Sequence, residues 1–311
     1  MPGFGAVIAR VAGNLRPMHR TTNSHRIQPM TKQVLHPLLA KFLVALASTV
    51  GLASSAAAHD FWIAPERYEV DSGTPLVLRL SMGHPDDVLA WPVSFERVVY
   101  LRAIGPQGVV DLQSSLATAS SDGVLRLPTL PDGHYVITIA STQAFSELPA
   151  DAFAGYLDEE GLDAVEADRT AKGQQNRPGR ELYSRRGKTL VTVGAPRGMS
   201  DVVGAPLGQT LEIVPITGIG YDGGANQLSA SIRYRGVPMD GVQVKLVRLG
   251  GQPTQEERGL VDKRRSERGG VVRFERPPPG TYMMQAIWSS PSASRNAEYA
   301  TVFSSFSFQI D

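Results

Sequence analysis

The chain has 311 residues, which is enough for two domains of ordinary size. It contains no cysteine, which excludes disulfide frameworks, thiolate metal sites and cysteine nucleophiles, so any metal ligands are nitrogen, oxygen or methionine sulfur atoms. Six of the 31 lysines and arginines, but none of the 30 aspartates and glutamates, lie in residues 1–58, so the rest of the chain carries a formal charge of −5. This balance argues against a nucleic-acid partner.

The N-terminal segment has the features of a secretory signal. Residues 30–58 contain two lysines, an apolar run over residues 42–53, and the cleavage pattern Ala56-Ala57-Ala58. The apolar run is too short to span a membrane comfortably, so a cleaved leader is favoured over an uncleaved membrane anchor. We expect residues 1–29 to be untranslated or disordered. The expected product is a periplasmic or secreted protein that begins with His59 and has no membrane span.

Strand patterns dominate the remainder of the chain. Apolar and polar residues alternate in four segments, residues 76–82, 135–139, 228–235 and 242–246. Gly or Pro interrupts the chain every dozen residues or so, which together with the alternation is typical of antiparallel β-sandwiches.

The segment between the two groups of strands has a different pattern. Residues 148–173 have the apolar spacing of a helix, broken at Gly161. The polar stretch 173–188 predicts a loop. Residues 189–196 and 208–215 each predict a strand, the second leading into the second group of strands.

An internal repeat relates the two groups. DGVLRLPTLPDGHY (122–135) aligns without gaps with GGVVRFERPPPGTY (269–282). Each copy predicts a strand, a turn and a strand that begins Gly-x-Tyr, so we expect Tyr135 and Tyr282 at equivalent corners of two sandwiches, in separate sheets. The alternative is a chance similarity between two hairpins of one sandwich, but a gapless match through two strands favours duplication.

These patterns predict a mainly β fold with two immunoglobulin-like antiparallel β-sandwich domains. The first domain is expected over residues 59–147 and the second over residues 206–311, joined by a short helical and loop connector with one strand at 148–205.

Three histidines follow the leader: His59, His84 and His134. A cleaved His59 offers its α-amine and its imidazole Nδ1, which close a chelate ring on one metal ion. A second imidazole completes a set of three nitrogens that suits Cu(II) and, less strictly, Ni(II). The amine binds metal only after it loses its proton, which its reference pKa of about 8 allows near neutral pH.

The three histidines are not equal as ligands. His84 is the best partner for His59, because Gly83 and Pro85 hold it in a tight turn after a strand that ends at Met82, although a turn histidine facing water is the alternative. His134 is a weaker third candidate. The second repeat has threonine at its position, which indicates an exposed strand position without a special role. Asp60 could donate an oxygen, but strand alternation points its side chain to the other face.

Several short motifs carry a family resemblance over essentially residues 58–311. In chain order they are AHDFWIAP, YLDEEGLD, SRRGKTLVTVG, LGQTLEIVP, YRGVPMDGVQVKL, GTYMMQAIWS and AEYATVFSSFSF. Together they resemble a bacterial family of domains of unknown function that has been described as the periplasmic component of a cobalt/nickel transport system. The resemblance implies metal handling and a membrane metal transporter as partner. The second half also resembles carboxypeptidase-regulatory-like sandwiches, which are accessory modules.

The leading functional hypothesis is a periplasmic protein that binds a divalent metal, namely copper, nickel or cobalt, through His59, His84 and His134. One alternative is a secreted copper-dependent oxidative enzyme, because lytic polysaccharide monooxygenases and copper-resistance carriers also begin with histidine on a β-sandwich. The other is a metal-free sandwich module that binds a protein or a glycan. No phosphate-binding loop, G-x-S-x-G or H-E-x-x-H motif is present, so no catalytic residue is predicted.

Overall fold

The computed structural model describes residues 60–91, 94–196, 201–219, 226–250 and 259–311. They all belong to one compact unit of the chain, Gly51–Asp311. The predicted leader and His59 lie outside the described residues.

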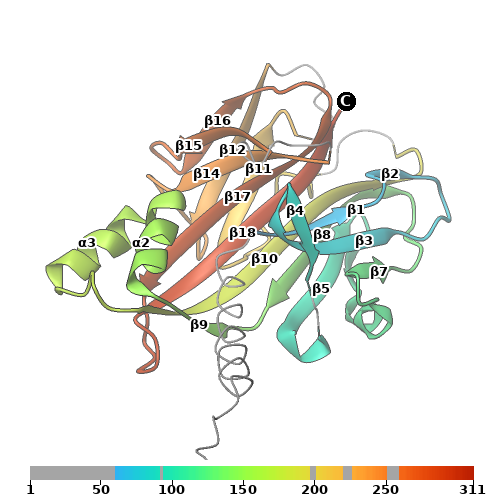
Figure 1. Ribbon diagram of the computed structural model, residues 1–311. Coiled ribbons are helices and arrows are strands. Elements are labelled where there is room, and N and C mark those ends of the chain that lie inside the picture. Colours follow the sequence, from blue (N-terminus) through green and yellow to red (C-terminus); the bar gives the residue numbers. More distant parts are fainter. Residues whose placement is uncertain (1–59, 92–93, 197–200, 220–225, 251–258) are drawn as a thin grey trace, which may run out of the picture. The chain divides into compact units, whose positions relative to one another are not determined.

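Within the described residues, ten strands form one large sheet, which we call the large sheet (Figure 1). In the order of their pairing, its strands are β15 (Leu260–Arg265), β14 (Gln243–Leu249), β17 (Gly280–Pro291), β18 (Tyr299–Ile310), β10 (Gly179–Val193), β8 (Gly133–Ser141), β5 (Val98–Gly105) and β6 (Gly108–Asp111), with β2 (Glu69–Val70) and β9 (Ala144–Leu148) also paired to β10.

Two smaller outer sheets complete the β structure of the described residues. The N-terminal outer sheet contains β1 (Asp60–Pro65), β3 (Val77–His84), β4 (Asp87–Ala90) and β7 (Val124–Arg126). The C-terminal outer sheet contains β11 (Leu211–Thr217), β12 (Gln227–Tyr234), β13 (Val237–Pro238) and β16 (Val271–Glu275).

The outer sheets cover opposite faces of the large sheet. On β8, Ile137 is part of an apolar core with Leu78 and Leu80 of the N-terminal outer sheet. Its neighbour Val136 is part of a second core with Ile213 of the C-terminal outer sheet. Successive residues of a strand point to opposite faces, so the two cores lie on the two sides of the large sheet. The mainly β fold with immunoglobulin-like sandwiches is therefore confirmed.

The segment expected to be helical contains α2 (Ala150–Glu159) and α3 (Asp163–Ala171). Gly161 separates them with a φ of +64°, a backbone conformation that favours glycine. Phe153 and Val165 of the helices bury their side chains against Ile287 and Phe303 of β17 and β18. Two short 3₁₀ helices, η2 (Phe95–Arg97) and η3 (Gln113–Thr118), lie in the first half of the chain.

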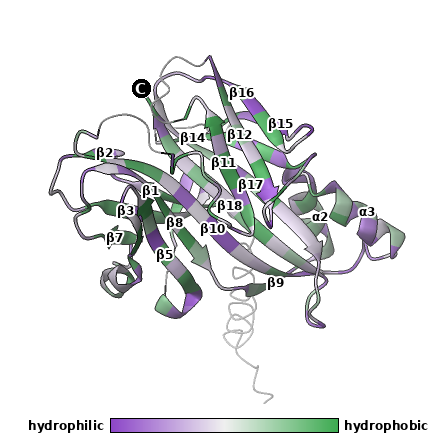
Figure 2. Ribbon diagram, turned by 180° about the vertical axis from the view of Figure 1, so that it is seen from behind, coloured by the Kyte–Doolittle hydropathy of each residue, from purple (hydrophilic) through white to green (hydrophobic). Residues whose placement is uncertain are grey.

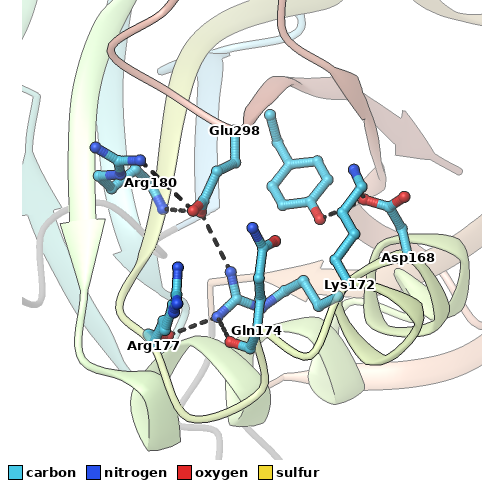
Figure 3. A network of polar contacts seen from close by, with 8 residues as sticks. Asp168, Lys172, Gln174, Arg177, Arg180 and Glu298 are labelled. Carbon is cyan, nitrogen blue, oxygen red and sulfur yellow. Dashed lines mark hydrogen bonds and ion pairs between the residues drawn. The ribbon is translucent and has the colours of Figure 1, made fainter.

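A polar network fixes α3 to the start of β18 (Figure 3). The buried Arg169 guanidinium pairs with Glu298 at 3.2 Å and also donates to the carbonyl oxygens of Gln174 and Arg177. The hydroxyl of Tyr299 donates a hydrogen bond to Oδ2 of Asp168 on the same helix, at 2.7 Å. Charge-assisted hydrogen bonds of this kind are stronger than neutral ones, so they hold the connector in a defined place.

The two repeat copies form equivalent local structures. Each runs from an outer sheet into the large sheet, and each tyrosine donates to a carbonyl four residues earlier, Tyr135 to Pro131 at 2.9 Å and Tyr282 to Pro278 at 2.7 Å. The expectation of separate sheets was wrong, because β8 and β17 both belong to the large sheet. The cause is the parallel pairing of β10 with β18, which joins the two sandwiches edge to edge.

The predicted loop over residues 173–188 was also wrong for its second half, because β10 begins at Gly179. Its backbone is paired on both sides, to β18 on one edge and to β9 and then β8 on the other. Figure 2 shows hydrophilic stretches within this strand. The side chains of Glu181, Arg185 and Lys188 are nevertheless buried, so polar composition here does not mean exposure to solvent.

Candidate functional site

The candidate site lies where β1 begins and β3 ends. β1 pairs with β3 in antiparallel register, and Asp60 lies opposite Gly83. His84 is the last residue of β3, so the strand continues two residues beyond the predicted end at Met82. It then pairs with Asp87 across a tight turn to β4.

Gly83 gives this hairpin its geometry. Its φ is +104°, and a Cβ at this position would collide with the carbonyl oxygen of Asp87. Because Gly83 leaves the extended conformation, the strict alternation of side chains does not hold at His84. Oδ2 of Asp60 lies 3.9 Å from Nδ1 of His84. The predicted orientation of Asp60 relative to His59 concerns a residue outside the described part of the chain.

The side chain of Asp60 is buried, with 3% of the residue exposed. Its Oδ1 accepts a hydrogen bond from Nε2 of Gln285 on β17, which is also buried. Gln285 points to the face of the large sheet opposite Met284, which belongs to the core beneath the C-terminal outer sheet. The Asp60 site therefore lies on the face that carries β1 and the two helices.

Buried charges surround Asp60. The Nζ of Lys245, a cross-strand neighbour of Gln285, lies 2.8 Å from a carboxylate oxygen of Glu160 and 3.9 Å from Glu159. Burial raises the pKa of Asp60, opposed by Lys245, the Gln285 hydrogen bond and His84. Burial likewise raises the pKa of Glu160 to about 7, opposed mainly by Lys245. One lysine thus faces two buried carboxyl groups, which favours a proton or a further cation nearby.

We call Asp60, His84, Glu160, Lys245 and Gln285 the Asp60 cluster. The sequence patterns did not point to Glu160, Lys245 or Gln285, although Lys245 and Gln285 are each a polar residue between apolar neighbours, in VKL and MQA. That isolation is the signal that could have found them, because a buried polar side chain requires a partner.

His134 lies elsewhere in the fold. It is 4% exposed, and its Nδ1 is 3.4 Å from the Thr192 hydroxyl on β10. His134 is two residues from Val136 on β8, so both side chains lie on the face of the large sheet that the C-terminal outer sheet covers. Asp60 lies on the other face. The expected exposure of His134 was wrong, because β8 is an inner strand between β5 and β10. The structure does not bring His134 and His84 together.

The described residues contain no group of three or more His, Cys, Asp or Glu side chains placed to hold a metal ion. Asp60 and His84 form a pair of potential donors, and the two donor atoms of His59 in the predicted chelate lie outside the described residues.

A cavity of about 370 Å³ lies beside the site. Trp62 of β1, Val88 of β4 and Leu249 of β14 form apolar parts of its wall. Glu66 and Arg79, which pair at 3.5 Å and are about half exposed, form a polar part. Its volume is within the range of small-molecule sites.

Among the described helices, none is both long and apolar enough to cross a membrane.

Comparisons with known proteins place the chain in a family but do not define its activity. No curated protein matches it in sequence. Its structure is similar to murine CEACAM1b at 9% identity, covering 81% of this chain and 98% of that chain, with a TM-score of 0.18. The D0-D1 domain of intimin is 8% identical, with 80% of this chain and 97% of that chain covered and a TM-score of 0.18. The FN1-FN3 domains of chicken CNTN1 are 15% identical, with 79% of this chain and 67% of that chain covered and a TM-score of 0.18.

These TM-scores are too low to support an argument, and the sandwich assignment rests on the strand pairing described above. The family comparison is more extensive. The model of the Domain of unknown function (DUF4198) matches residues 56–290, well over half of the chain. The chain therefore belongs to the DUF4198 family.

Proposed function

We propose that the protein is exported to the periplasm and binds one divalent metal ion, namely copper, nickel or cobalt, through an N-terminal chelate of His59 and His84. The observation that carries the proposal is the register of β1 on β3. Asp60, covalently bonded to His59, lies opposite Gly83, covalently bonded to His84. This register supports the proposal that His59 and His84 can reach one metal ion.

The donor set fits the metals named. In a processed chain, His59 supplies an α-amine and an imidazole nitrogen, and His84 supplies a second imidazole, a set suited to Cu(II) and Ni(II). The buried carboxyl groups of Asp60 and Glu160 share one lysine, Lys245, within the Asp60 cluster, which lowers the electrostatic cost of placing a cation there. His134 has no part in this site. A membrane metal transporter is the partner that such a carrier would serve.

The test compares the processed protein with a variant that has one alanine added before His59. The added residue moves the α-amine away and opens the chelate ring, so Cu(II) affinity should fall at least about tenfold in titration calorimetry. The control carries the same alanine after Asp311. Equal affinity of the two N-termini would defeat the proposal. Consumption of oxygen or peroxide by the copper-loaded protein with a reductant would instead favour the oxidative-enzyme alternative.

The cavity beside the site favours a second candidate, a module that binds a small glycan. In its polar part Arg79 donates hydrogen bonds and Glu66 accepts them, and sugar hydroxyls require both kinds of partner; the apolar wall beside them includes Val88. Saturation-transfer NMR with maltose and cellobiose tests it. Arg79→Ala should reduce any signal, and the control Arg126→Ala, an exposed residue of β7 outside the cavity, should not. Absence of signal from both sugars at millimolar concentration would reject this candidate.

A further inference from the structure

We propose that a second cavity, at the outer edge of β17, binds a short extended peptide segment, which adds to the large sheet beside Ser289. We call it the β17 cavity. The inference goes beyond metal binding and does not depend on it, because all its residues belong to the described part of the chain and none belongs to the Asp60 cluster.

β14 covers only part of the outer edge of β17. The pairing of β17 with β14 ends at Ala286, whereas its pairing with β18 continues to Pro291. If the register with β14 continued, Gly241 would lie opposite Ser289. Gly241 instead has a φ of +76° and donates its N–H to the carbonyl oxygen of Ser266 at 2.7 Å. The chain therefore leaves the edge of β17 open at the position opposite Ser289.

The main chain of Ser289 points toward this open position. Arg248 of β14 donates its N–H to Gly259 on the far side, so it does not hydrogen-bond its cross-strand partner Tyr282. Bonded and non-bonded pairs alternate along an antiparallel ladder, so the odd-numbered residues of β17 turn their N–H and C=O groups toward β14. Within the described chain these two groups of Ser289 make no hydrogen bond, although only 7% of the residue is exposed. Buried main-chain groups require a partner, and a second strand supplies both a donor and an acceptor.

The β17 cavity lies against this edge and has a volume of about 230 Å³. Its wall includes Ser289, the beginning of β14 and the first turn of α3. The volume is below the range of about 300–1,000 Å³ that is usual for sites enclosing a whole small molecule. It suits a short stretch of main chain, which pairs with a strand edge while alternate side chains enter the cavity.

The apolar part of the wall indicates which side chain fits. In an antiparallel pair, the residue opposite Ser289 has its side chain on the same face of the sheet as Ser289. Ile287, two residues earlier on β17, shares that face and packs against Leu162 and Val165 at the start of α3. The peptide residue that pairs with Ser289 should therefore be apolar, such as valine.

The charged part of the wall selects the flanking residues. It consists of Asp163, Asp240 and Arg265, and Arg265 pairs with Asp163 at 2.8 Å. One negative charge is left over. A peptide with basic residues beside the valine is therefore electrostatically complementary to the β17 cavity.

Hydrogen exchange of the free protein tests the open edge. Ser289 and Met283 both turn their N–H groups toward β14, but only Met283 has a strand partner there, Val247. The Ser289 amide should therefore exchange at least about a hundredfold faster than the Met283 amide, as measured by NMR. Equal protection would mean that Ser289 already has a partner within the chain, and this would overturn the proposal.

A titration with acetyl-Lys-Val-Lys-Val-amide tests the occupant. The Ser289 amide proton of ¹⁵N-labelled protein should move downfield, and its exchange should slow. The same peptide with both valine nitrogens methylated cannot donate to Ser289 and should bind at least about tenfold more weakly. Acetyl-Glu-Val-Glu-Val-amide should bind at least about threefold more weakly.

Two variants locate the bound peptide. Ala164→Phe places a large side chain in the β17 cavity from the first turn of α3, and the control Ala171→Phe adds the same side chain at the other end of this helix. Both alanines are exposed, so both variants should fold. Ala164→Phe should abolish the response of Ser289, and Ala171→Phe should preserve it.

Three results would overturn the proposal. An unchanged Ser289 amide with both peptides at millimolar concentration would mean that the cavity holds only water. Equal binding of the methylated and unmethylated peptides would show that main-chain pairing has no part in binding. A full response in Ala164→Phe would place the peptide elsewhere on the protein. None of these results bears on metal binding, which is measured separately.

Discussion

The buried Glu181 carboxyl group should make the protein less stable as pH rises. Glu181 on β10 is 2% exposed, and burial raises its pKa from 4.5 to about 7, opposed by hydrogen bonds that include one from Thr301. Below pH 4.5 the folded and unfolded chains both hold this proton. Between pH 4.5 and 7 only the folded chain holds it, so the free energy of unfolding falls, by about 3 kcal/mol in total for a shift of this size.

Glu181→Gln removes this titration while keeping the shape of the side chain. The variant and wild type should differ little at pH 4.5, and the variant should gain stability relative to wild type up to about pH 7, reaching about 3 kcal/mol. Urea unfolding at five pH values measures the free energy of unfolding of variant and wild type. Their difference contains no contribution from the other titrating groups, because these are the same in both proteins. The control is Glu147→Gln, an exposed residue on β9. A difference that stays constant with pH, or that changes in the opposite direction, would refute this account of Glu181.

Three further predictions concern stability and the hairpin. Tyr135→Phe and Tyr282→Phe each remove one hydrogen bond to a carbonyl oxygen, so each should lower the free energy of urea unfolding by about 1 kcal/mol; unequal losses beyond about 1 kcal/mol would contradict their equivalence. Glu212→Ala leaves the buried Lys188 without its partner at 3.1 Å and should cost about 3–5 kcal/mol, whereas a loss below about 1 kcal/mol would mean that water reaches Lys188. Gly83→Ala should distort the β3–β4 hairpin and weaken Cu(II) binding in calorimetry; unchanged binding would show that the turn does not position His84.

Local features of the fold could be predicted from the sequence. Alternation located β3, β8, β12 and β14, and helical spacing corresponds to α2 and α3. Met283 and Met284, neighbours on β17, lie in different apolar clusters, as strand alternation requires. These features depend on neighbours within a few residues, so the sequence pattern records them directly.

Features that depend on distant contacts could not be predicted. The parallel pairing of Glu181 with Tyr299 joins segments more than a hundred residues apart, and no local pattern indicates it. The contact of Asp60 with His84 lies at the end of β3, where Gly83 has a positive φ that regular strand spacing does not record. Strand pairing between distant segments and local departures from regular backbone geometry are both absent from the sequence spacing.

The shared large sheet also determines how the chain can be divided. Because β10 and β18 hydrogen-bond along their length, a fragment ending at residue 205 would leave the edge of β10 unpaired, and the remaining fragment would leave β18 in the same state. Unpaired inner strands are templates for intermolecular pairing, so separately expressed halves should aggregate or recombine into one complex. The two repeat copies are therefore expected to fold together, with a single cooperative unfolding transition.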